Sequence, residues 1–293
     1  MRFWGSLAGL VLLVTGPVMA QDSSVLEASQ RDFVERFLDA TQPARSTVSQ
    51  REIAADFLIA ELERRGLVAE RRPYLEPNVH PILDLIMPPF SGTNITASIP
   101  ATRDEASLIV LGAHYDSEAG SPGADDNASG IAALISIAVN LSRMPERRYS
   151  VMLAFFDQEE EGKVGSQALV RQLLADKIDI HSMHSIDMAG WDSDGDGAIE
   201  IDAPDIWFAR YQNAATRLEI PVSRASYDST DHVSFRAHGI DAICLSEAFR
   251  AGDSSPHRHR SSDMAETLNH AYLAANTELM LAVLRDTLSG AAE

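Results

Sequence analysis

The sequence contains a single cysteine, Cys244, among 293 residues, so no disulfide can form within the chain. Because Cys244 lies in an apolar run, we expect it in the core rather than as a nucleophile. Basic residues are also scarce, since 24 lysines and arginines stand against 43 aspartates and glutamates, giving a formal net charge of −19. So acidic a chain should be repelled by nucleic acids and anionic membranes, and we expect neither as a partner.

Beyond the start of the chain, no segment has 18 consecutive apolar residues, so none is expected to span a membrane. The start itself, residues 1–20, combines Arg2, a short apolar run and small residues ending at Ala20, which is typical of a secretory signal peptide. The alternative is an uncleaved anchor, which the short apolar run with Gly16 and Pro17 disfavours. We therefore expect a secreted or periplasmic protein without stable membrane association after cleavage.

The remaining chain shows an alternation of strand and helix patterns. Residues 21–45 are polar without a strong period and are expected to be loosely held, whereas apolar residues recur at helical spacing from Ser46 to Gly66. Residues 70–90 are predicted to form strand and loop, further strands are predicted at 107–117, 149–156, 178–188 and 240–247, and helices at 130–144, 163–175, 204–217 and 265–288. This alternation predicts an α/β fold in one domain, 46–293, whose mixed, mostly parallel sheet is flanked by helices on both faces.

Polar side chains of metal-ligand type follow the ends of the predicted strands. They are His114, Asp116, Asp125, Asp126, Glu159, Glu160, Glu161, Asp187, His257 and His259. Sites in open α/β sheets form at the carboxyl ends of the strands, so these groups should converge there. Acids gathered so closely would repel one another unless cations neutralised them, and mixed carboxylate and imidazole ligands suit zinc.

Five short motifs add a family resemblance to this reading. They are A-H-Y-D-S (113–117), P-G-A-D-D-N-A-S-G (122–130), E-E-E-G-K-V-G-S (159–166), S-I-D-M (185–188) and H-x-x-x-D (259–263). Together they resemble the two-zinc aminopeptidases, a family that also includes glutamate carboxypeptidases and glutaminyl cyclases. The resemblance covers roughly residues 46–290 and implies the fold of zinc aminopeptidases.

The resemblance also implies a ligand set for two zinc ions. One ion would be held by His114 and Asp187, the other by Glu160 and His259, and Asp126 would bridge them. His259 is preferred over His257 as the ligand because Asp263 follows it at the spacing of the family motif. A cis peptide bond between Asp126 and Asn127 is implied as well.

Three further residues take roles by the same resemblance. Glu159, beside a ligand but not itself one, would be the general base. Asp116 would orient His114 by a hydrogen bond to its second ring nitrogen. Tyr227 matches a tyrosine that stabilises the tetrahedral intermediate in some members. His232, close by in sequence, is expected to support or pack rather than to bind metal.

These roles favour an aminopeptidase acting on peptides with a free N-terminus, whose positive amine suits a carboxylate-rich site. A glutaminyl cyclase is the first alternative, although those enzymes often carry an acid where Thr230 stands. A carboxypeptidase or dipeptidase is the second, and it would need a cation such as Arg250, Arg258 or Arg260 for the substrate carboxylate. A non-catalytic binding module is disfavoured because all five ligands and Glu159 are retained. The sequence predicts no oligomeric state.

An acidic stretch at 192–202 resembles the first part of a calcium-binding loop. Asp192, Asp194 and Asp196 occupy the expected ligand positions, and Glu200 falls on the ninth. The twelfth position holds Ala203 instead of a bidentate glutamate, although Asp202 lies one residue earlier. The alternatives are a structural calcium site and a plain acidic turn.

Overall fold

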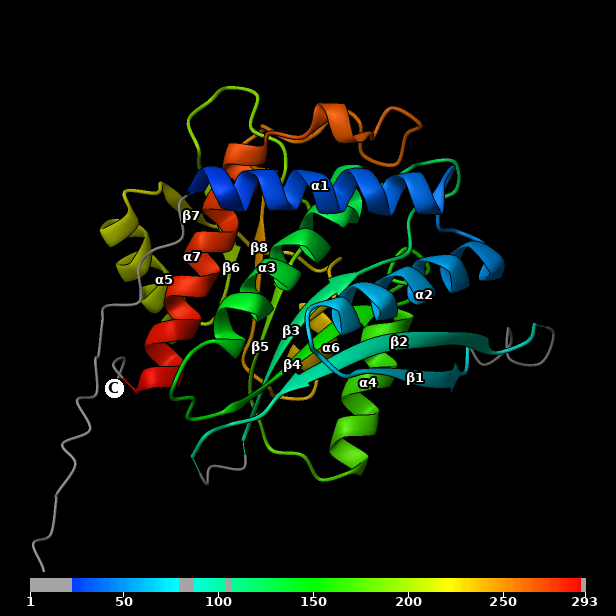
Figure 1. Ribbon diagram of the computed structural model, residues 1–293, viewed down its shortest axis with the longest axis horizontal. Helices are drawn as coiled ribbons and strands as arrows, with labels where there is room; N and C mark the ends of the chain where they lie inside the picture. Colours follow the sequence, from blue (N-terminus) through cyan, green and yellow to red (C-terminus); the bar gives the residue numbers. More distant parts are fainter. Residues whose placement is uncertain (1–22, 79–86, 104–106, 291–293) are drawn as a thin grey trace, which may run out of the picture.

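The computed structural model describes residues 23–78, 87–103 and 107–290, and the predicted signal peptide lies outside them (Figure 1). The helices in this part are α1 (Ser23–Thr41), α2 (Val48–Arg64), α3 (Gly130–Ser142), α4 (Val164–Ala175), α5 (Asp205–Leu218), α6 (His232–Arg236) and α7 (His270–Ser289). The strands are β1 (Ala69–Glu76), β2 (Phe90–Ile99), β3 (Leu108–His114), β4 (Ser150–Phe156), β5 (Ile180–Ile186), β6 (Ile199–Asp202), β7 (Val222–Arg224) and β8 (Ala242–Ser246). Among these described residues, no helix has the length and hydropathy that a membrane crossing requires.

The strands form one mixed sheet in the order β1-β2-β4-β3-β5-β8-β6-β7. Its centre, β4-β3-β5-β8, is parallel throughout, while β2 pairs antiparallel with β4 and β6 antiparallel with β8. The carboxyl ends of the four central strands therefore meet at one edge of the sheet. This confirms the predicted α/β fold with a mostly parallel, mixed sheet.

Helices cover both faces of the sheet, because alternate side chains of its central strands are apolar on both sides. On β3, Ile109 and Leu111 join the core formed with α1, α2, α3, α5 and α7, whereas Leu108 and Val110 join the core under α4. Figure 1 shows α1, α3 and α7 grouped on one face, with α4 on the other. Cys244 on β8 is fully buried, as its apolar neighbours predict.

The segment 21–45 differs from the prediction of a loosely held chain. From Ser23 to Thr41 it forms helix α1, whose buried Phe33, Val34 and Phe37 belong to the core shared with α3 and α7. These residues recur at helical spacing, but the segment contains so many polar residues that its apolar face was not recognised from the sequence. The folded unit therefore includes α1 and does not begin at residue 46.

Three strands escaped the sequence analysis. β2 lies within a chain of mixed polarity, and β6 and β7 have only four and three residues. β6 falls inside the acidic stretch that resembles a calcium loop, because Ile199 and Ile201 face the core while Glu200 and Asp202 face the other way. Pairing with β8, which is distant in sequence, decides that this stretch is a strand.

Candidate metal centre

The predicted ligands converge at the carboxyl edge of the central strands. His114 is the last residue of β3, Asp187 follows β5 directly, and Glu160 follows β4 after a short turn. Asp126 lies in the helical turn η2 (Ala124–Ser129), and its peptide bond to Asn127 is cis, as the resemblance implies. His259 is brought in by the long loop between β8 and α7.

Asp126 lies at the centre of this cluster and faces a histidine with each carboxylate oxygen. Its Oδ1 is 3.1 Å from Nε2 of His114, and its Oδ2 is 3.1 Å from Nε2 of His259. Asp187 approaches the same nitrogen of His114 at 3.5 Å, and Glu160 approaches that of His259 at 3.1 Å. The five residues thus lie as two pairs joined by the carboxylate of Asp126, and these are the pairs to which the resemblance assigns two ions.

His257 stays outside the cluster, as predicted. Its Nδ1 is 2.9 Å from the hydroxyl of Ser262, and its ring lies edge-on to Trp191. His232 is also directed elsewhere, with Nε2 3.1 Å from Asp202 and Nδ1 2.6 Å from Thr230. Neither imidazole is therefore placed to bind an ion at Asp126.

Asp116 connects the first ligand to the turn that carries the two glutamates. Its backbone carbonyl is hydrogen-bonded to Nδ1 of His114 at 3.2 Å, and its Oδ1, 3.4 Å from the same nitrogen, accepts the backbone N–H of Glu159 at 3.1 Å. Its Oδ2 accepts the backbone N–H of Glu160 at 3.2 Å. Asp116 thus holds the imidazole through its carbonyl and positions both glutamates through its carboxylate.

The acids of the cluster create a strongly cation-attracting site. Burial opposes a charge on His114, yet close contact with three aspartates raises its pKa well above the ordinary value. Contacts with Asp126 and Glu160 raise the pKa of His259 to about 10. Burial would also raise the pKa of Asp126, but the two histidines hold it well below its usual range. The protons on the imidazoles occupy positions where a metal ion would bind neutral histidine.

The residues present fit a pair of divalent ions. Nε2 of His114 is buried and faces two carboxylates, yet it makes no hydrogen bond within the described residues. Three carboxylates and two imidazoles without a sulfur are donors that suit zinc. Glu118, which the sequence analysis did not select, also comes within reach of Glu160 and His259. It follows β3 in the loop after Asp116, and no spacing rule singled it out.

Glu159 lies beside the cluster with its carboxylate buried, and burial raises its pKa well above the ordinary value. Asp231, from the start of α6, contributes to this shift, and burial raises its own pKa to about 7. Sequence reasoning missed Asp231 because only the fold brings α6 beside the end of β4. Glu159 can therefore hold a proton, and it is not one of the five residues of the cluster.

A buried arginine, Arg45, supports the loop that carries Asp126. The guanidinium of Arg45 donates to the carbonyls of Tyr115, Pro122 and Gly123, while its backbone N–H donates to Ser117. Gly123 has a φ of 65°, and a Cβ there would lie 2.3 Å from the carbonyl oxygen of Asp126. The loop therefore requires glycine at this position and a buried donor beneath it. Arg45 lies in the segment predicted to be loose, so sequence reasoning missed it.

Tyr227 lines the pocket over the metal centre together with Asp126 and Glu159. Its hydroxyl donates to the carboxylate of Glu200, which also accepts the backbone N–H groups of Arg250 and Ala251. Burial raises the pKa of Tyr227 above its ordinary value, so the phenol stays protonated. Glu200 thus fixes a wall of the pocket, which corrects its predicted place on a calcium loop.

The acidic turn itself brings together a different set of aspartates from the predicted one. Asp192 and Asp194 offer oxygens close to one of Asp253, whereas Asp196 is not in this group. The carboxylate of Asp196 accepts the backbone N–H of Ala198 instead. Asp202, proposed as a substitute ligand, is buried against His232 and Arg236. The structure thus brings Asp192 and Asp194 close to Asp253 and directs Asp196 and Asp202 elsewhere, and calcium binding stays a prediction.

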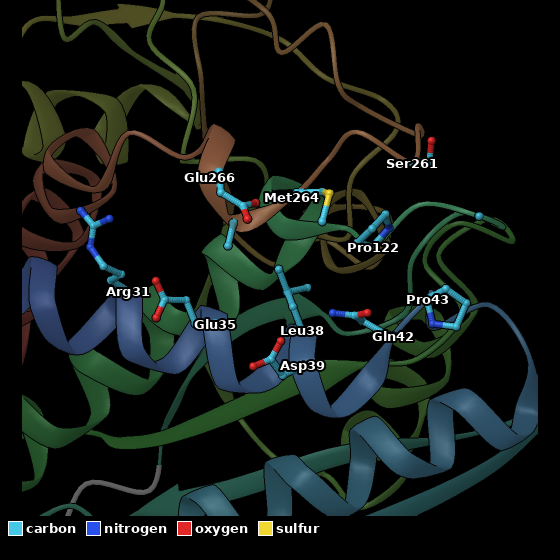
Figure 2. A pocket seen from close by; sticks show the side chains of 12 residues that line it. Arg31, Glu35, Leu38, Asp39, Gln42, Pro43, Pro122, Ser261, Met264 and Glu266 are labelled. Carbon is cyan, nitrogen blue, oxygen red and sulfur yellow. The ribbon is translucent and has the colours of Figure 1, made fainter.

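Two cavities border this region, and they differ in character. The pocket over the metal centre is small, about 60 Å³, and contains three acids of the cluster region, Asp126, Glu159 and Asp187. A larger cavity of about 430 Å³ lies between α1 and the loop 261–266 (Figure 2). Figure 2 shows Leu38 and Met264 facing it, with none of the predicted metal ligands in its lining. The chemistry of the ligands therefore selects the smaller pocket as the candidate active site.

Known proteins share this architecture. The structure of a zinc aminopeptidase from Bacillus subtilis matches with a TM-score of 0.79 at 14% identity, covering 89% of this chain and 95% of that one. A glutaminyl cyclase from Bacteroides thetaiotaomicron, bound to N-acetylhistamine, matches with a TM-score of 0.74 at 19% identity, covering 88% and 97%. This chain therefore has the α/β fold that these enzymes share.

Sequence comparison narrows the class to a family. The profile of peptidase family M28 matches residues 94–284, so the chain belongs to this family. A probable leucine aminopeptidase of Trichophyton verrucosum (strain HKI 0517) is 26% identical over 216 residues, covering 67% of this chain. The alignment spans only 58% of that relative's length.

Proposed function

We propose that this protein is an exported, zinc-dependent aminopeptidase that hydrolyses the N-terminal peptide bond of peptides. The observation that carries the proposal is the pairing of Glu160, which faces His259, with the adjacent Glu159, which is buried beside the cluster without joining it. A metal-dependent hydrolase needs both a metal ligand and a separate base, and two neighbouring glutamates would supply them. The family and the names of its relatives support the same activity.

Two zinc ions would be held by the five clustered residues. His114 and Asp187 would bind one, Glu160 and His259 the other, and Asp126 would bridge them through its two oxygens. When bound, such ions lower the pKa of a water molecule and polarise a carbonyl group. Asp116 would keep Nε2 of His114 directed at its ion by holding the opposite ring nitrogen.

The remaining steps belong to the side chains around the cluster. Glu159 would take a proton from the attacking water and deliver it to the leaving amine, which requires a carboxylate that binds no metal. Tyr227 stays protonated, and its single O–H, which Glu200 accepts in this structure, would turn to donate to the oxyanion that develops on the scissile carbonyl. The acids around the site would also attract the positive amine of the substrate.

A glutaminyl cyclase activity is the alternative on the same scaffold, since one structural neighbour is such an enzyme. The contacts of His114 with Asp126 and Asp187 supply donors for a second ion beside the pair of Glu160 and His259, as the two-ion hydrolase requires. Thr230, which lines the pocket, also favours the hydrolase, because glutaminyl cyclases often carry a second acid at that position.

The test is a panel of aminoacyl-nitroanilides, N-blocked peptides and N-terminal glutaminyl peptides, assayed with zinc and after exhaustive chelation. We expect zinc-dependent release from free N-termini only. Formation of pyroglutamate would select the cyclase, and undiminished hydrolysis after chelation would contradict the metal-dependent mechanism. Metal analysis of the purified protein should give two zinc ions per chain.

Export is supported by the pattern of residues 1–20, which lie outside the described residues.

A structural calcium ion at the acidic turn would be held by Asp192, Asp194 and Asp253 rather than by the predicted set. Calcium should then raise the melting temperature of the parent protein but not that of a variant with these three aspartates changed to asparagine. An equal response of both proteins would identify a plain acidic turn.

A further inference from the structure

The lining of the pocket over the metal centre includes two arginines among its acids. Its described lining combines the acids Asp126, Glu159 and Asp187 with small hydroxyl-bearing side chains, and its only basic residues are Arg250 and Arg258. An amine-binding site needs the acids but has no use for two guanidinium groups. Their presence points to an anionic group on the substrate.

Both arginines are held against one aromatic ring. The guanidinium carbons of Arg250 and Arg258 each lie 5.9 Å from the ring centre of Phe249. Arg250 is fixed further by donating to the carbonyl of Ser226 at 3.1 Å and by lying 5.8 Å from the ring of Tyr227. Stacking on aromatic faces orders a guanidinium while leaving its N–H edge free to bind an anion.

Arg258 differs from Arg250 in the partners of its guanidinium. Its Nε is buried and makes no hydrogen bond within the described residues, although it lies 3.5 Å from Oδ2 of Asp126. Oδ2 of Asp126 faces His259 as part of the ligand cluster and is therefore not available to Arg258 alone. The side chain of Arg258 is 39% exposed and lines the pocket, so a ligand can reach it.

We propose that Arg258 binds a substrate carboxylate next to the scissile bond, which makes this protein selective for peptides that carry one there. The inference rests on the proposed aminopeptidase function and adds the class of substrate. Arginine presents planar paired donors that match a carboxylate, and such charge-assisted hydrogen bonds are among the strong ones. A cavity of about 60 Å³ admits a group of this size beside the metal centre.

Two parts of a peptide can place a carboxylate there. One is the free C-terminus of a dipeptide, and the other is the acidic side chain of the N-terminal residue. Matched substrate pairs separate them, because each pair differs only in one carboxylate. The first pair is Leu-Ala and Leu-Ala amide, and the second is Glu-Ala amide and Gln-Ala amide.

The experiment measures kcat and KM of the zinc-loaded full chain on both pairs, for the parent and for Arg258→Gln. We expect the substitution to raise KM about tenfold or more for the carboxylate-bearing member of one pair, with KM of its neutral partner unchanged. The affected pair identifies the source of the carboxylate. Arg258→Lys should recover part of the loss, because it keeps the charge but not the paired donors.

Arg260→Gln is the matched control, since Arg260 is exposed two residues away and does not line the pocket. It should leave both pairs unchanged. Equal loss on all four substrates, or loss of bound zinc in Arg258→Gln, would overturn the proposal by placing Arg258 in the support of the metal centre.

Calorimetric titration with a reduced-amide analogue of Leu-Ala and of Glu-Ala amide gives a readout that does not depend on turnover. At least one analogue should bind the parent about tenfold more tightly than it binds Arg258→Gln. If the parent binds in this way but releases no N-terminal residue from any peptide, the aminopeptidase function fails while the carboxylate site stands. Equal binding of both analogues to parent and variant refutes the site.

Discussion

The carboxylate of Asp263 accepts the backbone N–H of Asp126 at 3.1 Å, and so a residue from the C-terminal loop fixes the bridging ligand. Its other oxygen accepts the N–H of Asp125 at 2.9 Å. Asp263 and His259 lie in one short segment, so the same loop supplies a ligand and the support of its partner. Such supporting contacts orient metal ligands almost as strictly as the ligands orient the metal.

Asp263→Asn should weaken zinc binding, because an amide can accept only one of these two N–H bonds and opposes the second with its own NH₂ group. We expect the zinc dissociation constant, measured by competition with a chelator, to rise about 10- to 100-fold. Asp286→Asn, which removes a surface ion pair with Arg217, is the control and should bind zinc like the parent. Unchanged affinity in Asp263→Asn would show that the loop holds Asp126 without this carboxylate.

Glu159→Gln should abolish most of the activity while leaving two zinc ions bound, because the amide cannot take a proton and the residue is not a ligand. We expect kcat to fall by about 10²–10⁴-fold on the peptide cleaved best by the parent. Glu161→Gln is the matched control, since Glu161 is exposed on the same turn. Normal turnover in Glu159→Gln would remove this residue as the base.

Arg45→Met should destabilise the protein, because it removes the guanidinium donor from the carbonyls of Tyr115 and Pro122 and leaves that of Gly123 with only the N–H of Ala128. We expect the free energy of unfolding, measured by urea titration, to fall by about 3 kcal/mol or more. The zinc dissociation constant should rise as well, because these carbonyls belong to the loop that carries Asp126. Arg31→Met, an exposed change on α1, should alter neither quantity.

The stability of the protein should fall with acidification through the pH range where a buried histidine would take up a proton. His184 is fully buried between Ser182 and Tyr211, and burial lowers its pKa from 6.5 to about 3. Between these values the unfolded chain binds a proton that the folded chain does not, so stability is lost as pH falls below 6.5. The slope from this group approaches about 1.4 kcal/mol per pH unit.

Urea unfolding of the parent and of His184→Asn from pH 7 to pH 4 measures this contribution. The variant should be less stable at pH 7 but should lose less stability on acidification. His238→Asn, which alters an exposed histidine, should follow the parent at every pH. Parallel curves for the parent and His184→Asn would show that another group controls the acid response.

The local pattern of the chain was enough to predict the parallel centre of the sheet. The runs that became β3, β4 and β8 are mostly apolar on both faces, whereas β5 carries histidines and serines between its apolar residues. Candidate ligands could be found because polar residues interrupt the pattern where each strand ends, and the family resemblance then selected five of them. A residue such as His114, at the end of β3, can therefore be selected from the sequence as a candidate before any contact is known.

Tertiary structure alone decided which distant groups support the site. Arg45 lies about 70 residues from the carbonyls it holds, and Glu200 lies 27 residues from Tyr227. Asp253 replaces Asp196 beside Asp192 because a loop from after β8 folds onto the acidic turn. Sequence spacing records which side chains neighbour one another along a helix or strand, but these contacts arise only when separate elements pack, so no local pattern contains them.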